Sequence, residues 1–119
     1  MADLQPVSLT SLPDFEPFPG YRGKLIHAKS MTVVHWTIDK DHEVPDHAHP
    51  HEQIINVMQG EFELNLSGRR VVMKAGDVLV IPGNVRHSGR SLTDCRIMDI
   101  WHPCREDYQV EQPETNNHE

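Results

Sequence analysis

The sequence predicts an all-β fold of the antiparallel sandwich or barrel type. Short runs rich in apolar and β-branched residues recur at near-regular intervals, and Gly, Pro, Asn and Asp residues separate them. The segment Glu61–Leu66 alternates strictly between polar and apolar residues, which is the pattern of a strand with one buried face. We find no convincing helical pattern and no internal repeat.

The length and charge of the chain restrict its organisation and its partners. A chain of 119 residues is the size of one domain. With 11 basic and 18 acidic residues its net charge is -7, so we expect no nucleic acid and no membrane surface as partner, because both are polyanionic. A small anionic substrate remains compatible with this charge. No apolar stretch approaches the ~18 residues that a membrane helix needs.

We divide the chain into an extended Pro-rich arm (residues 1–20), a barrel (21–105) and a polar, acidic tail (106–119). Four prolines exclude a continuous helix in the arm. Its five large apolar side chains are unusual for a solvated tail, so we expect the arm to lie on a surface. That surface belongs either to a second subunit or to the chain's own barrel. Because one small core benefits from a partner, we expect a homodimer.

The expected strands follow one another along the barrel. Lys24–Ala28 is a weak strand, and Met31–Ile38 is a better one because β-branched and aromatic residues favour sheets. The remaining strands are Glu43–His49, Gln53–Gln59, Glu61–Leu66, Arg70–Lys74, Val78–Ile81, a strand that begins at His87, and Cys95–Trp101. Residues 112–119 have almost nothing to bury, and we expect them to be disordered.

Two further features bear on the cellular compartment. Cys95 and Cys104 do not form a CxxC pair, and we expect two reduced thiols. The N-terminus has no basic region followed by an apolar run, which is the pattern of a signal peptide. We therefore expect a cytoplasmic protein.

A cluster of histidines is the first candidate site. His47 and His49 point the same way if the backbone is extended, since side chains alternate along a strand. Gln53 opens the next apolar run, and His87 follows a turn. Three imidazoles and an amide oxygen could hold one divalent transition metal (Ni, Zn, Fe, Mn or Cu) inside the barrel. The other histidines have no such spacing, and we interpret them as ordinary polar residues.

The last strand is the second candidate site. By alternation Asp99 and Trp101 share a face with Ile97, so Asp99 would be a carboxyl group in an apolar cavity and a candidate acid or base. Trp101 offers a flat wall for a sugar ring, and Arg105 a fork for a carboxylate. The alternative is an edge strand with a solvated Asp99, in which Arg105 pairs with a neighbouring acidic residue, Glu106 or Asp107.

These two stretches resemble the cupin family. The first cupin motif (His-x-His, three residues, Glu or Gln, six residues, Gly) is met by His47, His49, Gln53 and Gly60. The second motif is met by Gly76, Pro82 and His87, with Asn84 where Gly is usual. The residue that usually opens the first motif is also Gly, and here it is Asp41. Asn tolerates left-handed backbone, so Asn84 is a mild departure. The resemblance covers residues 21–105 and implies an antiparallel double-stranded β-helix, a jelly-roll type barrel, with a metal at the histidines.

Within the cupins, the chain resembles small pectin-degradation proteins that linearise unsaturated uronates. Their last strand ends in Asp-x-Phe-x-Pro-x-Arg, which Asp99, Pro103 and Arg105 match, with Trp101 in place of Phe. The resemblance implies a metal-dependent enzyme that opens 4,5-unsaturated uronate monomers, from pectin or alginate lysis, to linear 4-deoxy-5-keto uronates. Asp99 would be the acid and base, and Arg105 and Trp101 would position the substrate.

Two other functions stay open: a metal-dependent dioxygenase of the cupin type, and a module that binds a sugar acid without turnover. Gln53 bears on the choice. An amide cancels none of the charge of the ion, which leaves a stronger Lewis acid than a Glu ligand would. The motif lacks the carboxylate that completes the triad of two histidines and one carboxylate in many ferrous oxygenases, although iron sites made of three histidines also exist. Both points favour the first function.

Overall fold

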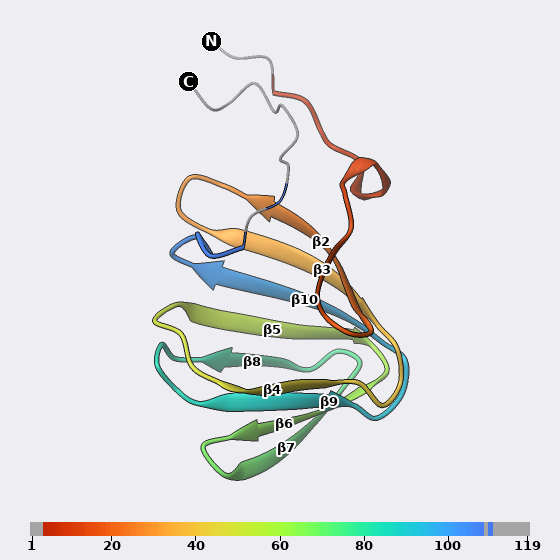
Figure 1. Cartoon of the computed structure of the whole chain (residues 1–119), viewed down its shortest axis with the longest axis vertical. Coiled ribbons are helices and arrows are strands. Elements are labelled where there is room, and N and C mark those ends of the chain that lie inside the picture. The colour runs from red at the N-terminus through yellow and green to blue at the C-terminus, as the bar shows by residue number, and fades with distance from the viewer. Residues whose placement is uncertain (1–3, 109, 111–119) are drawn as a thin grey trace.

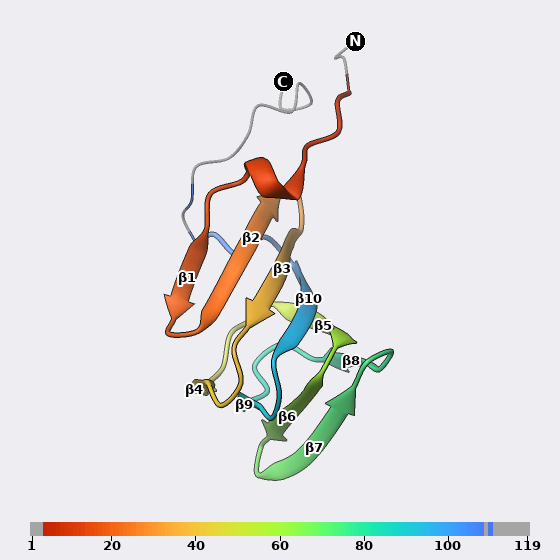
Figure 2. The ribbon, with the colours of Figure 1, turned by 90° about the vertical axis from the view of Figure 1, so that its right-hand side faces the viewer.

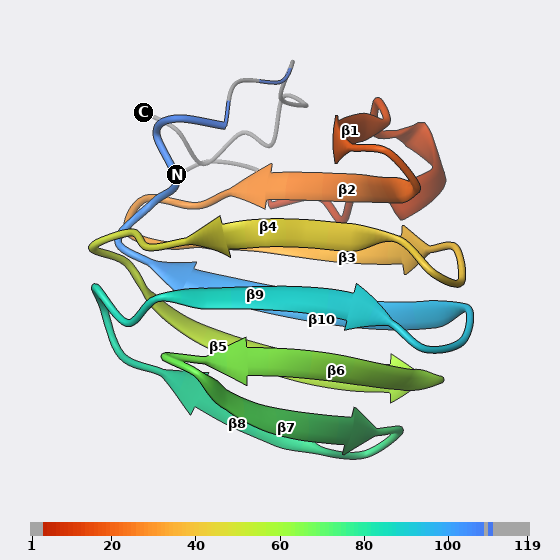
Figure 3. The same cartoon turned by 60° about the horizontal axis from the view of Figure 1, so that its bottom comes forward.

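A computed structural model describes residues 4–108 and 110 as two antiparallel sheets packed face to face (Figures 1 and 3). Sheet A has the strand order β1-β2-β3-β10-β5-β8, and sheet B the order β4-β9-β6-β7. The strands are β1 (Phe15–Phe18), β2 (Tyr21–His27), β3 (Thr32–Ile38), β4 (Glu43–His47), β5 (Glu52–Gln59), β6 (Glu61–Leu66), β7 (Arg69–Lys74), β8 (Val78–Ile81), β9 (His87–Ser91) and β10 (Cys95–His102). The prediction of an all-β fold is confirmed.

The chain passes repeatedly from one sheet to the other. The connections β3–β4, β5–β6, β7–β8 and β9–β10 each join a strand of one sheet to a strand of the other (Figure 3). This winding is the double-stranded β-helix. It places β10 in sheet A between β3 and β5, so residues from three distant stretches of sequence become neighbours. Among the described residues, no helix is long and apolar enough to cross a lipid bilayer.

The core lies between the sheets and follows the alternation of side chains. Val34, Trp36 and Ile38 of β3 are buried on the inner face, as their spacing predicts. Phe62 and Leu64 of β6 meet them from sheet B. Burying one such side chain contributes roughly 1.5–3 kcal/mol, so this layer holds the two sheets together.

Part of the N-terminal arm lies on the chain's own sheet. After a 3-10 turn at Leu9–Ser11, β1 pairs with β2 (Figure 2), and the Phe15 ring lies 6.1 Å from the Trp36 ring. The sequence pattern did not indicate this strand, because Pro17 interrupts it. A proline is tolerated here because β1 is an edge strand. The predictions for residues 111–119 lie outside the described part of the chain.

The strand that carries the first histidines is shorter than predicted. β4 ends at His47, so His49 lies in the loop before β5 rather than in the expected strand Glu43–His49. The pairing of β4 with β9 shifts register between Val44 and His47, where Pro45 has no N–H to donate. The two histidines therefore converge through a bend and not through strand alternation.

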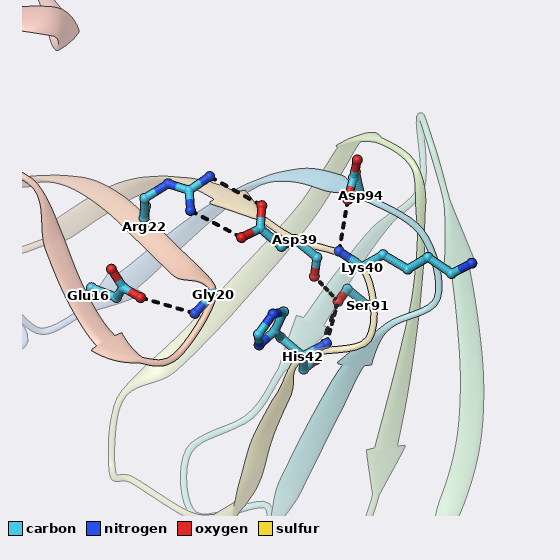
Figure 4. A network of polar contacts seen from close by, with 8 residues as sticks. All are labelled: Glu16, Gly20, Arg22, Asp39, Lys40, His42, Ser91 and Asp94. Atoms are coloured by element: carbon cyan, nitrogen blue, oxygen red, sulfur yellow. Dashed lines mark hydrogen bonds and ion pairs between the residues drawn. The ribbon is translucent and has the colours of Figure 1, made fainter.

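The β3–β4 turn closes the end of the sandwich that is opposite to the histidines (Figure 4). The hydroxyl of Ser91 donates to the carbonyl of Asp39 (2.5 Å) and accepts from the N–H of His42 (3.1 Å). Asp94 accepts from the N–H of Lys40 at 2.8 Å. These bonds tie the turn to the β9–β10 connection, so this end is held by side chains bonded to backbone.

Candidate metal centre

Three histidines meet at the open end of the sandwich. His47 is the last residue of β4 and lies opposite His87, the first residue of β9, while His49 follows in the loop. One ligand atom from each ring lies within 4.8 Å of the other two. Two nitrogens bound to one ion at 2.0–2.1 Å in a tetrahedral arrangement lie about 3.4 Å apart, so ring movements of up to about an ångström give bonding distances. These three histidines can bind a metal ion.

Backbone carbonyl groups orient all three imidazoles in the same sense. The Nδ1 atoms of His47, His49 and His87 lie 2.8, 3.1 and 2.9 Å from the carbonyl oxygens of Pro45, His51 and Val85. A carbonyl oxygen only accepts, so each Nδ1 carries the hydrogen and each Nε2 keeps its lone pair. Metal-bound histidines are held by the same kind of contact.

The β8–β9 turn fixes the loop that carries His49. The N–H of Asn84 donates to the carbonyl of His49 at 2.7 Å. Asn84 has a φ of 66°, the left-handed conformation that Asn adopts more readily than most residues other than Gly. At Gly83 a Cβ would lie 2.3 Å from the carbonyl oxygen of Pro50, so only glycine allows this approach. The turn of the second histidine motif therefore positions the loop of the first motif that carries His49.

Four buried side-chain atoms have no hydrogen-bond partner among the described residues, and two of them belong to predicted metal ligands: Nε2 of His49 and Oε1 of Gln53. Such atoms are rare in folded proteins, because each costs about 1–3 kcal/mol. The amide nitrogen of Gln53 donates to Asp99 at 3.0 Å, which turns its oxygen the other way. A divalent transition metal would satisfy both atoms, and the donor set suits one. The role of Gln53 as fourth ligand remains a prediction.

Burial also keeps the imidazoles in the metal-binding form. Burial, together with the positive charge of Arg105, lowers the pKa of His49 to about 4. Burial likewise lowers the pKa of His87. Neutral imidazole binds metal and imidazolium does not, so protons compete weakly for these two rings.

Asp99 lies on the inner face of β10 with 7% of its surface exposed, which excludes the alternative of a solvated carboxylate. Its two oxygens accept hydrogen bonds from Trp36 Nε1 and Gln53 Nε2, both at 3.0 Å. Burial raises the pKa of Asp99 to about 6, although both hydrogen bonds and the charge of Arg105 act to lower it. The group can therefore hold or release a proton near neutral pH, as an acid or base must.

Arg105 is buried, with 5% of its surface exposed. Its Nε and Nη2 donate to the carboxylate of Asp107 at 3.0 and 2.8 Å, so the fork predicted to bind substrate contacts a neighbour. This ion pair between Arg105 and Asp107 is the one that the alternative interpretation of the last strand predicts. The guanidinium also lies over the rings of Trp101 and Tyr108, 4.8 and 4.0 Å from their centroids.

These groups share one cavity of about 60 Å³ between the sheets. Its polar lining residues are His47, Gln53, His87, Ser88, Asp99 and Arg105, and its aromatic ones include Trp36, Trp101 and Tyr108. The ring nitrogen of Trp101 is buried there without a partner among the described residues. The cavity therefore brings three of the predicted metal ligands, His47, Gln53 and His87, together with the predicted catalytic and substrate-binding residues. His49 is not among the lining residues and joins the site through the histidine cluster.

Two aromatic residues of this site, Trp36 and Tyr108, were not predicted from the sequence as site residues. The alternation in β3 places Trp36 on the inner face, but its bond to Asp99 depends on β3 lying beside β10. Tyr108 follows the last strand, where no periodic pattern exists to place a side chain. Its ring lies 5.6 Å from the Trp101 ring and covers the cavity.

The residues that we assigned no role have structural contacts. A ring nitrogen of His51 lies 3.1 Å from the carbonyl of Cys104, which ties the histidine loop to the segment after β10. Cys95 and Cys104 are free thiols, as expected. His51 is not one of the three clustered histidines.

Comparison with known proteins agrees with this geometry. KdgF from Halomonas sp. is 28% identical, with a TM-score of 0.77 over 84% of this chain and 94% of its own. An RmlC-like cupin from Shewanella frigidimarina is 27% identical, with a TM-score of 0.82 over 91% and 98%. The polyketide cyclase RemF from Streptomyces resistomycificus, at 20% identity and a TM-score of 0.73 over 96% and 90%, shares the fold. Curated protein sequences give no match.

A family model provides the assignment. The model described as "Cupin domain" matches residues 34–101, more than half of the chain. This range runs from β3 to β10 and contains both histidine motifs, the Gln53 position and Asp99. The chain belongs to the cupin family.

Proposed function

We propose that this cupin is a metal-dependent enzyme that converts 4,5-unsaturated uronate monomers to linear 4-deoxy-5-keto uronates. One observation carries the proposal: a histidine cluster suited to a metal and a buried carboxyl group with a raised pKa line the same cavity. The likeness to KdgF, an unsaturated-uronate-linearising protein, supports the substrate class. The match of Asp99, Pro103 and Arg105 to the uronate-linearising motif supports it as well.

The substrate carries an enol ether conjugated to a carboxylate, and the reaction needs a proton at C4 and water at C5. A bound divalent ion would supply a Lewis acid for an oxygen of the substrate. Asp99, hydrogen-bonded on both oxygens, would donate the proton to C4 and take one back as the ring opens. Water adds and is later lost, so the net reaction is an isomerisation.

Arg105 and Gln53 would assist through charge. The guanidinium of Arg105 lies in the cavity wall, where its positive charge would attract a substrate carboxylate. Asp107 and the substrate carboxylate would then share this guanidinium. Gln53 leaves the full charge of the ion for the substrate, because its amide is neutral. The two residues together favour an anionic ligand in an acidic protein.

The size of the cavity sets a condition on binding. About 60 Å³ has room for a metal ion and a few waters but not for a sugar acid. Tyr108, in the segment after β10, lines the cavity. We expect this segment to move when a uronate binds.

The test follows the absorbance of the conjugated double bond after metal-loaded protein is mixed with an unsaturated uronate. Loss of that absorbance with formation of a keto product supports the proposal. Oxygen uptake by ferrous protein without linearisation would identify a dioxygenase instead. Binding of uronate with the ligand recovered unchanged would identify a binding module and refute the enzyme.

A further inference from the structure

A row of side chains at the open end of sheet A extends beyond the predicted site residues. The residues paired in register across β2, β3, β10 and β5 are His27, Thr32, Trp101 and Gln53. By alternation His27 and Thr32 share the inner face with the core residues Leu25 and Val34. Thr32 is fully buried and His27 is half-buried. Two residues without an assigned role therefore lie in line with two predicted site residues.

The hydrogen bonds of His27 and Thr32 form a continuous chain. Nε2 of His27 lies 2.9 Å from the carbonyl oxygen of Tyr108, which only accepts, so this nitrogen carries the hydrogen. In the neutral ring Nδ1 then accepts, and the hydroxyl of Thr32 donates to it at 2.7 Å. The same hydroxyl oxygen accepts from the N–H of Arg105 at 2.9 Å. Two side chains thus link the backbone of Arg105 to the backbone of Tyr108.

This chain holds both ends of segment 105–108, whose first and last residues line the cavity. The N–H of Tyr108 donates to the carbonyl of Arg105 at 3.0 Å, which folds the segment into a turn. Thr32 binds the start of the turn from a fully buried position, whereas His27 binds its end from a half-buried one. The start is therefore the anchored end of the segment, and the end is the one that can be released.

The other contacts of Tyr108 restrict its movement less. Its ring lies 4.8 Å from the Phe15 ring and 5.6 Å from the Trp101 ring. Ring contacts allow several arrangements, so they tolerate a small displacement. A hydrogen bond weakens steeply once its angle is lost. The bond between His27 and the Tyr108 carbonyl therefore sets how far the end of the segment can move.

We propose that His27 is a positioning residue of this site. Its hydrogen bond to the Tyr108 carbonyl, called the latch below, holds segment 105–108 over the cavity and breaks when an anionic ligand enters. The bond from Arg105 to Thr32 stays intact and keeps the guanidinium in the cavity wall. The latch rests on geometry, and the identity of the ligand as a uronate rests on the proposed function.

The latch has a consequence for affinity. A cavity of about 60 Å³ does not hold a sugar acid, so the ligand binds the opened form of the protein. Affinity falls in proportion to the fraction of protein that is open before binding. A weaker latch should therefore strengthen binding.

Hydrogen exchange of single amides, measured by NMR on metal-loaded protein, tests the latch without turnover. The Tyr108 amide is bonded within the segment and exchanges when the segment opens. His27→Ala should speed this exchange by about 2- to 12-fold, the range that corresponds to one hydrogen bond. The Arg105 amide, bonded to Thr32, should change less. His35→Ala, on the outer face of β3, is the control and should change neither amide.

Two conservative variants separate the latch from a general role of His27 in stability. Gln can place an amide nitrogen near the position of Nε2 and donate to Tyr108, whereas the shorter Asn reaches only the position of Nδ1, next to Thr32. His27→Gln should restore slow exchange of the Tyr108 amide, and His27→Asn should not. Equal behaviour of the two variants, or unchanged Tyr108 exchange in His27→Ala, would overturn the proposal.

Steady-state kinetics with an unsaturated uronate test the affinity step. His27→Ala should lower KM by the same factor as it speeds exchange, with a smaller change in kcat, because neither Asp99 nor the histidine cluster contacts His27 through a described bond. A raised KM would show that the latch persists in the complex and would overturn its release on binding. Absence of turnover in wild type, with the expected exchange, would refute the proposed function and leave the latch standing.

Discussion

The two ends of the sandwich use polar groups in opposite ways. At the closed end, polar side chains form hydrogen bonds with backbone groups of the turns (Figure 4). These side chains are Ser91, Asp94 and Glu16. At the open end, Nε2 of His49 and Oε1 of Gln53 are buried without partners among the described residues. The same strands run between the two ends, so the difference lies in the local residues and not in the fold.

This difference separates structural polar groups from functional ones. A satisfied buried group adds to stability, whereas an unsatisfied one reduces it by about 1–3 kcal/mol. The two unsatisfied acceptors at the open end therefore need an explanation, and a bound ligand provides one. Variants at the open end should therefore change metal content or turnover, and variants at the closed end should change stability alone.

The largest expected effect is the loss of metal from His49→Ala. Removing one of three imidazoles leaves too few strong donors, so the variant should lose most of the metal that wild type holds at close to one ion per chain. Elemental analysis of purified protein measures this directly. His102→Ala, which removes an exposed histidine outside the cluster, is the control and should stay loaded. Equal loading of His49→Ala and wild type would refute the metal centre.

Asp99→Asn should lower the rate of uronate linearisation by roughly 10²–10⁴, the usual contribution of an acid or base. The three histidines keep the metal, so elemental analysis should change little. Asn has one acceptor oxygen where Asp99 serves two donors, Trp36 and Gln53, so a small loss of stability is expected as well. A variant as active as wild type on a turned-over uronate would reject Asp99 as the catalyst.

Gln53→Glu sharpens the same experiment. A carboxylate at this position cancels part of the charge of the ion and lies beside Asp99, where two negative charges repel. The variant should retain metal and lose activity. Full activity would show that the neutral amide is not needed for the reaction.

Arg105→Ala should weaken uronate binding by about 10- to 150-fold, which corresponds to the 1.5–3 kcal/mol of a charge-assisted hydrogen bond. The change should appear in KM more than in kcat, because Arg105 positions the substrate. Asp107→Asn is the matched control: it keeps the guanidinium and breaks its ion pair. Tighter binding by this control would show that Asp107 competes with the substrate, and an unchanged KM in Arg105→Ala would remove Arg105 from the site.

The predictions from sequence succeeded where the structure depends on local geometry. The spacing of His47, His49 and His87 identified a real cluster, because carbonyl groups within two residues orient each ring. Asn84 was expected to be left-handed and is, since that preference belongs to the residue itself.

They were incomplete where contacts join distant residues. Trp36 and Asp99 are 63 positions apart and meet only because β3 lies beside β10. The burial of Arg105 depends on the chain turning back after β10, so that its N–H donates to Thr32. Strand order and chain reversals arise from the packing of the whole molecule, which a motif does not encode.

The smallest expected effect tests the closed end. Ser91 is fully buried, and Ser91→Ala leaves the carbonyl of Asp39 and the N–H of His42 without this partner. We expect the free energy of unfolding to fall by about 1–3 kcal/mol, measured by urea denaturation of the metal-loaded protein. Metal content and uronate turnover should match wild type, because Ser91 neither lines the cavity nor belongs to the histidine cluster. Loss of metal at unchanged stability would show that the two ends are coupled, and that the division between a structural and a functional end is wrong.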